Sequence, residues 1–199
     1  MGNITLLDIL GSALIAGFLL MIISHSNARM NETLFTTGND LVVQEELVTL
    51  VQTIEEDFRR LGYCRDQMKI ADPSKALLQA GAASISFQTD VDNDGNVDTL
   101  SYYLGAVADL AVTRNPRDRI LYRKVNGSGP MPMNIGLTLF DVHYFDVNNN
   151  SIARPVASPS AVHQIEIDIR LESTAPYDTT YSFAAWRQLR LRSRNLTGR

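Results

Sequence analysis

The chain divides into three stretches by its pattern of apolar and polar positions. The first, Ile4–Ile23, is almost entirely apolar, and Asp8 is the only charged side chain in it. From there to Leu61, apolar residues recur mostly every three, four or seven positions, which is the spacing of one face of an α-helix. After Gly62, apolar and polar residues alternate in short runs, as they do in β-strands. The pattern predicts a long helix followed by a β-sheet domain.

The apolar run is long enough to cross a lipid bilayer. A helix needs about 20 apolar residues to span the hydrocarbon core, and Ile4–Ile23 has this length. A secretory signal instead has a basic start, a shorter apolar run and a cleavage site with small residues. Met1 to Asn3 carry no charged side chain, and no such site follows Ile23. We therefore expect residues 1–29 to form a retained transmembrane helix half.

The second stretch, residues 30–62, is amphipathic and is expected to continue the same helix. Acidic residues, among them Glu45, Glu46, Glu55 and Asp57, fill the faces that the apolar residues leave. No proline interrupts the stretch, and Gly62 stands where a C-terminal cap is expected. The apolar face consists of Leu34, Leu41, Leu47, Val51, Ile54, Phe58 and Leu61.

The third stretch, residues 63–199, is predicted to form an antiparallel sheet of about four to six strands. In Ile165–Glu172 four aliphatic and four polar residues alternate, so this strand is expected to be half-buried. In Ile135–Asp146 the apolar positions change phase near Leu139, which predicts a β-bulge. The fold class is therefore α+β, with the long N-terminal helix packed on an antiparallel sheet. The predicted strands are Ser84–Gln88, Val97–Leu104, Ile120–Val125, Ile135–Asp146, Ile165–Glu172 and a final run within Tyr181–Asn195.

Charge is distributed unevenly along the chain. The formal net charge is −4, and this acidic balance argues against a nucleic-acid partner. Residues 1–62 carry three Arg against eight Asp and Glu, whereas residues 187–199 carry five Arg and no acid. We hypothesise that the basic and acidic elements pair, within a subunit or between neighbours; the alternative is two separate solvated faces. The hypothetical pairs join Arg190, Arg192 and Arg194 with Glu45, Glu46 and Glu55.

The segment "DVDNDGNVD" offers a candidate metal site. Its oxygen-bearing side chains alternate around Gly95, as the ligands of an EF-hand-type calcium loop do. Ser101 replaces the bidentate Glu at the twelfth position, and Asp, Asn and Gly also form tight turns for backbone reasons alone. A weak calcium site and an acidic turn therefore both stay open, and neither requires a cofactor. The candidate ligands are Asp90, Asp92, Asp94, Asn96 and Asp98.

Candidate catalytic residues are few. His25, His143 and His163 lie far apart in the sequence, with no nucleophile motif, phosphate-binding loop or metal-ligand spacing beside them. Cys64 is the only cysteine, so it cannot form an intramolecular disulfide, and we expect it to be buried. We predict that the protein is not an enzyme.

Several segments, taken in order, resemble type IV pilins and pseudopilins, and their minor subunits in particular. "ITLLD", Ile4 to Asp8, is similar to the first residues of mature pilins, which are an apolar residue, Thr, two aliphatic residues and an acid. "EEDFRRLGY", Glu55–Tyr63, resembles the helix end of minor pilins. The segments "FQTDVDNDGNVDTLSYYL", "ILYRKVNG" and "LRLRSRN" are also similar to parts of these subunits. The resemblance covers most of the chain.

The resemblance implies a subunit of a type IV pilus or a type II secretion-like filament. Such a protein is anchored in the inner membrane as a precursor and then joins other pilin or pseudopilin subunits in a cell-surface or periplasmic filament. The apolar helix halves bundle in the filament, and the heads face outward. Asp8 would pair with the N-terminal amine of a neighbour, because an unpaired carboxylate in apolar surroundings is costly. The implied assembly residues are Ile4, Thr5, Leu6, Leu7 and Asp8.

Three points stay open beside this interpretation: the processing of the N-terminus, the role of Asp8 and the function itself. The processing enzyme of the family cuts after a glycine, and here Asn3 precedes Ile4 with Gly2 one place earlier. The mature start then lies elsewhere, the enzyme tolerates the variant, or the protein stays an uncleaved anchor. Asp8 could also be an interfacial acid that the helix dipole favours. The alternative function is a single-pass membrane-anchored extracytoplasmic module that uses a calcium-ordered loop for binding or adhesion.

Overall fold

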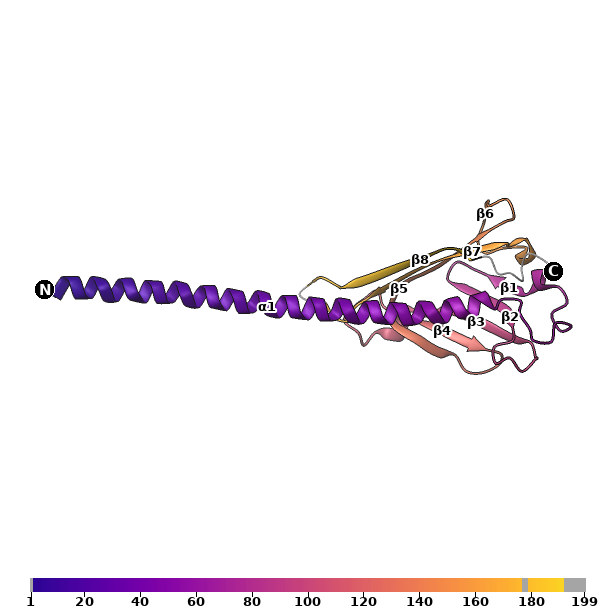
Figure 1. Ribbon diagram of the computed structural model, residues 1–199, viewed down its shortest axis with the longest axis horizontal. Coiled ribbons are helices and arrows are strands. Elements are labelled where there is room, and N and C mark those ends of the chain that lie inside the picture. Colours follow the sequence, from indigo (N-terminus) through magenta and orange to yellow (C-terminus); the bar gives the residue numbers. More distant parts are fainter. Residues whose placement is uncertain (1, 177–178, 192–199) are drawn as a thin grey trace. The chain divides into compact units, whose positions relative to one another are not determined.

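The computed structural model describes residues 2–176 and 179–191. The described chain contains one long helix followed by an antiparallel sheet (Figure 1), so the predicted α+β class is confirmed. It separates into two compact units, Met1–Asn39 and Asp40–Arg199. The elements are α1 (Gly2–Arg59), η1 (Pro73–Lys75), β1 (Leu77–Ala80), β2 (Ser84–Thr89), β3 (Asp98–Leu104), η2 (Val107–Leu110), β4 (Arg119–Val125), β5 (Met131–Phe145), β6 (Ser151–Ile152), η3 (Pro159–Ala161), β7 (Gln164–Glu172) and β8 (Phe183–Leu191).

The first unit is entirely helical in its described part. Its large apolar side chains are exposed; Leu10, for example, is 65% exposed and Phe18 is 65% exposed. By length and composition, α1 can cross a membrane. The predicted division into residues 1–29, 30–62 and 63–199 stays a prediction.

The second unit begins inside α1, and residues 40–59 of the helix pack on the sheet. Val43, Leu47, Leu50, Ile54 and Phe58 are buried in one apolar core with the inward side chains of the strands. These positions follow the helical period, so one face of the helix enters the core. Two members of the predicted apolar face differ, because Leu34 is 62% exposed and Leu41 is 63% exposed.

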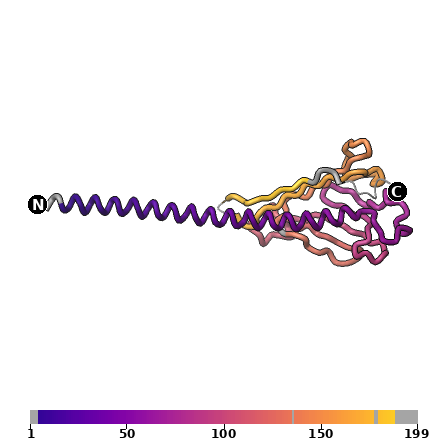
Figure 2. The backbone as a smooth tube through the Cα atoms, viewed as in Figure 1, coloured from indigo at the N-terminus to yellow at the C-terminus, as the bar shows by residue number. Residues whose placement is uncertain are grey.

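The sheet is a meander in which strands that follow one another in the sequence pair side by side. Its order is β1-β2-β3-β4-β5-β7-β8, and β6 pairs with one end of β5. The backbone tube in Figure 2 shows this back-and-forth path after the helix. The strands β3, β4, β5 and β7, which carry the charged residues described below, are consecutive neighbours in the sheet. Short connections between antiparallel neighbours make this topology compatible with the turn signals of the sequence.

The predicted strands are present, with differences at the sheet edges and in β5. β1 and the two-residue β6 were not predicted, so the sheet has more strands than expected. β5 begins at Met131, four residues before the predicted start at Ile135. The predicted bulge is confirmed, because the register of β5 on β7 shifts between Leu137 and Leu139. Gly136 lies beside this shift with φ +94°, a conformation that L side chains rarely adopt.

β7 is more deeply buried than its alternating pattern predicts. Ile165, Ile167 and Ile169 lie in the core as expected. On the opposite face, Asp168 and Glu172 are buried as well. The polar face of β7 is therefore covered by other charged side chains and is not an open solvated surface.

Candidate functional site

Asp8 lies near the start of α1, on the exposed apolar surface of the first unit. Ile4 and Thr5 belong to the same first turns, and Leu6 and Leu7 beside them are 67% and 73% exposed. The Ser12 hydroxyl donates to the backbone oxygen of Asp8 at 2.5 Å, which leaves the carboxylate out of this bond. Among the described residues, no side chain pairs with that carboxylate. The predicted assembly residues thus lie together on an apolar helix surface with one uncompensated acid.

A second acid of the same helix, Asp57, is buried against the sheet. Its Oδ2 accepts a hydrogen bond from Nε of Arg123 in β4 at 2.7 Å, and its Oδ1 accepts one from Nη2 at 3.1 Å. The hydroxyl of Tyr102 in β3 also donates to Oδ2. The side chains of Arg123 and Asp57 are only 17% and 12% exposed. This triad joins the helix to two adjacent strands, since Tyr102 and Arg123 are cross-strand partners.

The triad also changes the proton affinities of its members. Hydrogen bonds to Asp57 raise the pKa of the Arg123 guanidinium, so Arg123 stays charged. Burial is the largest cause that raises the pKa of the Tyr102 hydroxyl, and the negative charge of Asp57 is the second largest. Tyr102 therefore stays a hydrogen-bond donor. The sequence interpretation counted Asp57 among the outward acids, and this was wrong. A signal was present: Arg123 is two positions after the buried Leu121, so it lies on the core face of its strand.

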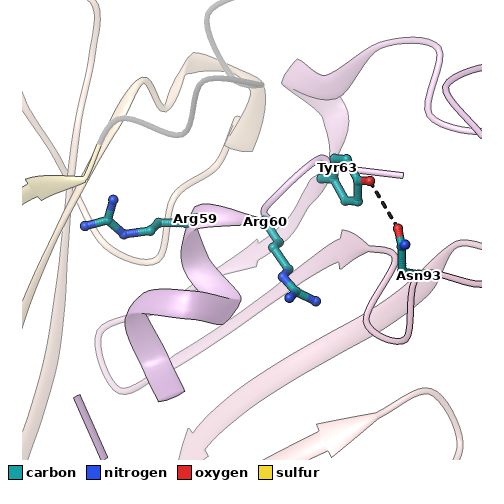
Figure 3. Close-up of a pocket in the computed structure, with 4 residues that line it drawn as sticks. All are labelled: Arg59, Arg60, Tyr63 and Asn93. Atoms are coloured by element: carbon teal, nitrogen blue, oxygen red, sulfur yellow. Dashed lines mark hydrogen bonds between the residues drawn. The ribbon is translucent and has the colours of Figure 1, made fainter. Parts of the chain in front are cut away.

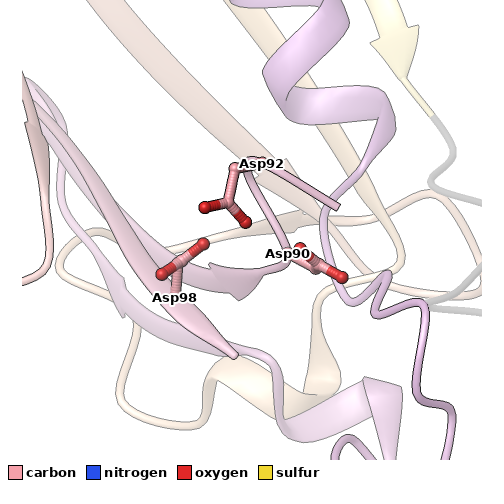
Figure 4. Close-up of side chains that lie close together, drawn as sticks. All are labelled: Asp90, Asp92 and Asp98. Atoms are coloured by element: carbon pink, nitrogen blue, oxygen red, sulfur yellow. The ribbon is translucent and has the colours of Figure 1, made fainter. Parts of the chain in front are cut away.

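The acidic loop between β2 and β3 brings three of the five predicted calcium ligands together. Single carboxylate oxygens of Asp90, Asp92 and Asp98 lie within 4.8 Å of one another (Figure 4). Asp94 and Asn96 bond to each other instead, from Asn96 Nδ2 to Asp94 Oδ2 at 2.6 Å. No ion is part of the structure, and the calcium assignment stays a prediction.

Asp90 holds this loop together through its own hydrogen bonds. It is fully buried, and it accepts bonds from the backbone N–H groups of Arg65 at 3.1 Å, Asp94 at 3.1 Å and Gly95 at 3.0 Å. Burial alone would raise the pKa of its carboxyl, but these backbone donors outweigh burial and lower the pKa. Asp98 is similar, because its Oδ2 accepts from the Val91 N–H at 2.9 Å. The carboxylates therefore have a structural role as turn acceptors.

A hollow of about 360 Å³ lies where the helix end meets this loop, and Arg59, Arg60, Tyr63 and Asn93 line it (Figure 3). The Tyr63 hydroxyl donates to Asn93 Oδ1 at 3.1 Å. Nη1 of Arg60 donates to the backbone oxygen of Val91 at 3.1 Å. These contacts attach the loop to the residues that directly follow α1.

The predicted charge pairs would join acids of the helix with arginine side chains at the end of the chain, which lie outside the described side chains. Glu55 pairs with Arg59 one helical turn away, at 3.6 Å. Glu45 and Glu46 are exposed, and no described cation lies within ion-pair distance of either. Arg190 belongs to β8, while Arg192 and Arg194 lie outside the described residues. Pairing of all three arginines with the helix acids stays a prediction.

Charged groups that the sequence interpretation missed gather on the outer face of β5, β7 and β8. Nε of Arg187 donates to Asp168 Oδ1 at 2.5 Å, and Nη2 of Arg117 donates to Glu172 Oε2 at 2.6 Å. Burial alone would raise the pKa of Glu172, but the hydrogen bonds from Arg117 and Asn115 lower it below its ordinary value. The signal for this cluster was a charged residue at every second position of β7, namely Glu166, Asp168, Arg170 and Glu172.

Asp118 is an acid that lies buried in the second unit. It is 1% exposed, and neither carboxylate oxygen has a hydrogen-bond partner among the described residues. The nearby Thr113 hydroxyl donates to the backbone oxygens of Leu110 at 3.0 Å and Asn115 at 3.3 Å instead. Burial therefore raises the pKa of the Asp118 carboxyl.

Comparison of the chain with protein-family models, with curated proteins and with solved structures finds no match. The site must therefore be judged from its own chemistry. His143 lies 3.1 Å from Asp141 and 3.7 Å from Asp168, but no hydroxyl or thiol bonds to it within the described part of the chain. Cys64 is buried, as expected. The ion pairs and hydrogen bonds described above hold elements of the second unit together. The apolar side chains of the helix in the first unit are exposed.

Proposed function

We propose that this chain is a structural subunit of a filament of the type IV pilus or type II secretion kind, assembled through its N-terminal helix. The observation that carries the proposal is the apolar part of the first unit, where residues 5–23 expose their side chains on every side. Asp8 is the only charged residue in that stretch, and its carboxylate has no partner among the described residues. Such a helix needs lipid or other apolar helices around it. The resemblance of Ile4–Asp8 to the start of mature pilins supports other helices as its final surroundings.

Asp8 gives the assembly its axial register in this proposal. A carboxylate among apolar groups costs several kcal/mol unless it is paired or protonated. A cation from the next protomer would compensate for that cost at only one axial position of the two helices. The candidate cation is the N-terminal amine of that protomer. Ile4, Thr5, Leu6 and Leu7 would then pack beside the same neighbour. The pair thereby selects one arrangement among many that are equally apolar.

Before assembly, the helix would hold the protein in the inner membrane with the sheet head on the extracytoplasmic side. Afterwards the same surface would be covered by the helices of other pilin-like subunits. No catalytic step enters this function. Nearly all charged groups of the head described above pair with other groups of the head. This supports a structural function.

The proposal can be tested by cross-linking the full chain in membranes. Cys64 is 1% exposed, so a cysteine introduced by Leu10→Cys would be the only accessible thiol. We expect a thiol cross-linker to join neighbouring subunits of this variant into covalent dimers, which is the limit for one accessible thiol per chain. Asp8→Ala should reduce the dimer yield about tenfold or more, because the favoured register is lost, while Asp8→Glu should preserve it.

The controls for this experiment separate assembly from crowding in the membrane. Ser24→Ala in the Leu10→Cys background alters an exposed polar position of the same helix and should leave the dimer yield unchanged. N-terminal sequencing of sheared surface material should show a mature end at Ile4. A chain that remains monomeric at every density in the membrane would refute the proposal.

A second candidate function is a membrane-anchored binding module with a calcium-ordered loop. The observation that favours it is the approach of Asp90, Asp92 and Asp98 to within 4.8 Å. Calcium should then raise the melting temperature of the full chain in detergent, and Asp92→Asn with Asp98→Asn should abolish the rise. A monomeric protein whose ligand binding is lost with a chelator would favour this function over the filament. An unchanged melting temperature in millimolar calcium would eliminate it.

A further inference from the structure

We propose that neighbouring heads in this filament meet through two complementary faces of the second unit. An acidic groove beside α1 on one copy receives an arginine surface on the sheet of the next copy. This inference rests on the proposed function and adds to it the contact between heads. The acidic groove is lined by Glu45, Glu46, Thr49, Leu50, Thr53, Met133 and Asn134. The arginine surface is Arg117, Arg170 and Arg187 with the apolar residues Leu139 and Phe183 between them.

The acidic groove presents hydrogen-bond acceptors that lack donors. It has a volume of about 290 Å³, and its two carboxylates, those of Glu45 and Glu46, have no cation among the described residues. The Thr49 hydroxyl already donates to the backbone oxygen of Glu45 at 3.0 Å. Oδ1 of Asn134 is buried and has no hydrogen-bond partner in the described chain. A buried acceptor without a donor is unfavourable, so a guanidinium with several N–H groups suits this groove.

The arginine surface presents the opposite charge. The side chains of Arg117, Arg170 and Arg187 are 56%, 45% and 63% exposed. Their acidic partners lie beneath them, because the side chains of Glu172 and Asp168 are only 4% and 13% exposed. The groups that reach solvent are therefore mainly cationic.

Apolar residues complete the arginine surface. Two hollows of about 390 and 420 Å³ adjoin there and share Leu139 and Arg170 in their walls. The Arg170 guanidinium lies 4.5 Å from the ring centroid of Phe183, which holds its planar group in place. Leu139 is 43% exposed and Phe183 is 58% exposed. A partner that brings carboxylates and some apolar surface would fit this face.

The two faces lie on opposite sides of the sheet. Side chains alternate between the faces of a strand, and Phe140, Val142 and Ile169 point into the core that residues 40–59 of α1 share. Leu139 and Arg170 are cross-strand partners of the opposite parity, so they face away from that core. The acidic groove lies on the helix side, between α1 and the start of β5.

This placement identifies the partner as a second copy of the same chain. Complementary faces on opposite sides of one domain make a head-to-tail contact, and such contacts can repeat along an open helical assembly. A two-fold dimer would require each face to contact its own copy, which like charges disfavour. The charge match would orient neighbouring heads, while the apolar helices supply most of the association.

The contact can be tested with cysteine pairs in the full chain in membranes. We expect a double variant, Glu46→Cys with Leu139→Cys, to form an oligomer ladder with a short thiol cross-linker. Each single variant should form no cross-linked dimer, because the two positions meet only between copies. The matched control replaces Leu139→Cys by Val147→Cys, which is 64% exposed on the turn after β5, and should give no ladder.

Charge variants provide the second measurement. Glu45→Gln with Glu46→Gln should lower the yield of the ladder about fivefold, and 1 M salt should have a similar effect. Cross-linking for this measurement would use Leu139→Cys with Thr49→Cys. Glu56→Gln, an exposed acid outside the groove, should change nothing.

The outcomes distinguish this inference from the function on which it rests. If Leu10→Cys gives cross-linked dimers and the head pair gives no ladder, the filament stands and the contact between heads is refuted. Dimers from a single head variant would refute the head-to-tail geometry. If neither position cross-links, both proposals fail.

Discussion

Residues 5–39 and residues 40–59 belong to one helix, yet their side chains have different surroundings. In the first part, Leu10 and its apolar neighbours are exposed, and the carboxylate of Asp8 has no described partner. In the second part, Ile54 and Phe58 are buried, and the carboxylate of Asp57 accepts three hydrogen bonds from the sheet. Helical propensity alone therefore does not determine what a residue of α1 contributes.

The difference indicates where each part finds its stabilising contacts. The chain supplies every partner of Asp57, so this acid serves the fold of the head. It supplies none for Asp8 within its described residues, and in the proposed function the partner of Asp8 is a neighbouring subunit. Three variant pairs and one variant measured at two pH values test this division.

The largest effect is expected from the apolar side chains of the helix. Phe58→Ala removes a ring that is 2% exposed and lies 5.2 Å from the Phe87 ring centroid. It should lower the free energy of unfolding of the head by about 3–5 kcal/mol. Leu10→Ala should leave that free energy unchanged. Denaturant unfolding in detergent, followed by the fluorescence of Trp186, measures both; equal losses would contradict the division.

The acids of the helix should differ in the same direction. Asp57→Ala leaves Arg123 buried without its counter-ion, so we expect a loss of about 3 kcal/mol. Glu56→Ala removes only an exposed pair with Arg60 and should cost less than about 0.5 kcal/mol. Replacing both members by Asp57→Leu and Arg123→Leu should recover part of the loss. A loss of the same size from Glu56→Ala would show that burial of the triad is unimportant.

Two glycines give a smaller contrast. A Cβ at Gly136 would lie 2.7 Å from the Glu172 backbone oxygen, at a φ of +94°, so Gly136→Ala should destabilise the head by about 2 kcal/mol. Gly38 has nothing within 4 Å, and Gly38→Ala should increase the helix content slightly. Thermal melts followed by circular dichroism report both changes. A neutral Gly136→Ala would mean that the bulge can relax.

The smallest effect concerns Asp118 and depends on pH. Burial raises the pKa of Asp118, so the folded protein binds this proton more tightly than the unfolded chain does. Both states are protonated well below the ordinary value of 3.8, and the penalty for ionising the buried group develops as pH rises through the raised pKa. Asp118→Asn should thus stabilise the head by about 1 kcal/mol at pH 7 and not at pH 3. Unfolding curves at the two pH values test this; an equal gain at both would exclude ionisation as the cause.

The sequence allowed prediction of those elements whose local pattern and tertiary role agree. The helix, β2, β3, β4 and β7 follow the helical or alternating period, and the phase change near Leu139 predicted the bulge. β1 has only four residues between turn-forming segments, too few for alternation to be recognised. The start of β5 contains Pro132. Proline has no backbone N–H to donate within a sheet, so the local sequence argues against a strand there.

The charged contacts could be predicted far less well. Asp57 and Arg123 are 66 positions apart, and nothing near Asp57 distinguishes it from the outward acids around it. Only the position of Arg123 on the core face of its strand indicated that a buried acid pairs with it. The acidic loop was recognised as a cluster, but periodicity does not tell which carboxylates accept backbone N–H groups. Long-range pairing depends on the topology, which the local pattern does not contain.

The shared core of helix and sheet has a practical consequence for producing a water-soluble head. A chain shortened to begin at Gly62 would leave Phe87, Leu100 and Tyr102 uncovered, and Arg123 would lose its carboxylate. Such a fragment should aggregate. A chain that starts near Asp40 keeps the helix face that packs on the sheet and omits the exposed apolar segment. It is therefore the shortest form expected to stay in solution.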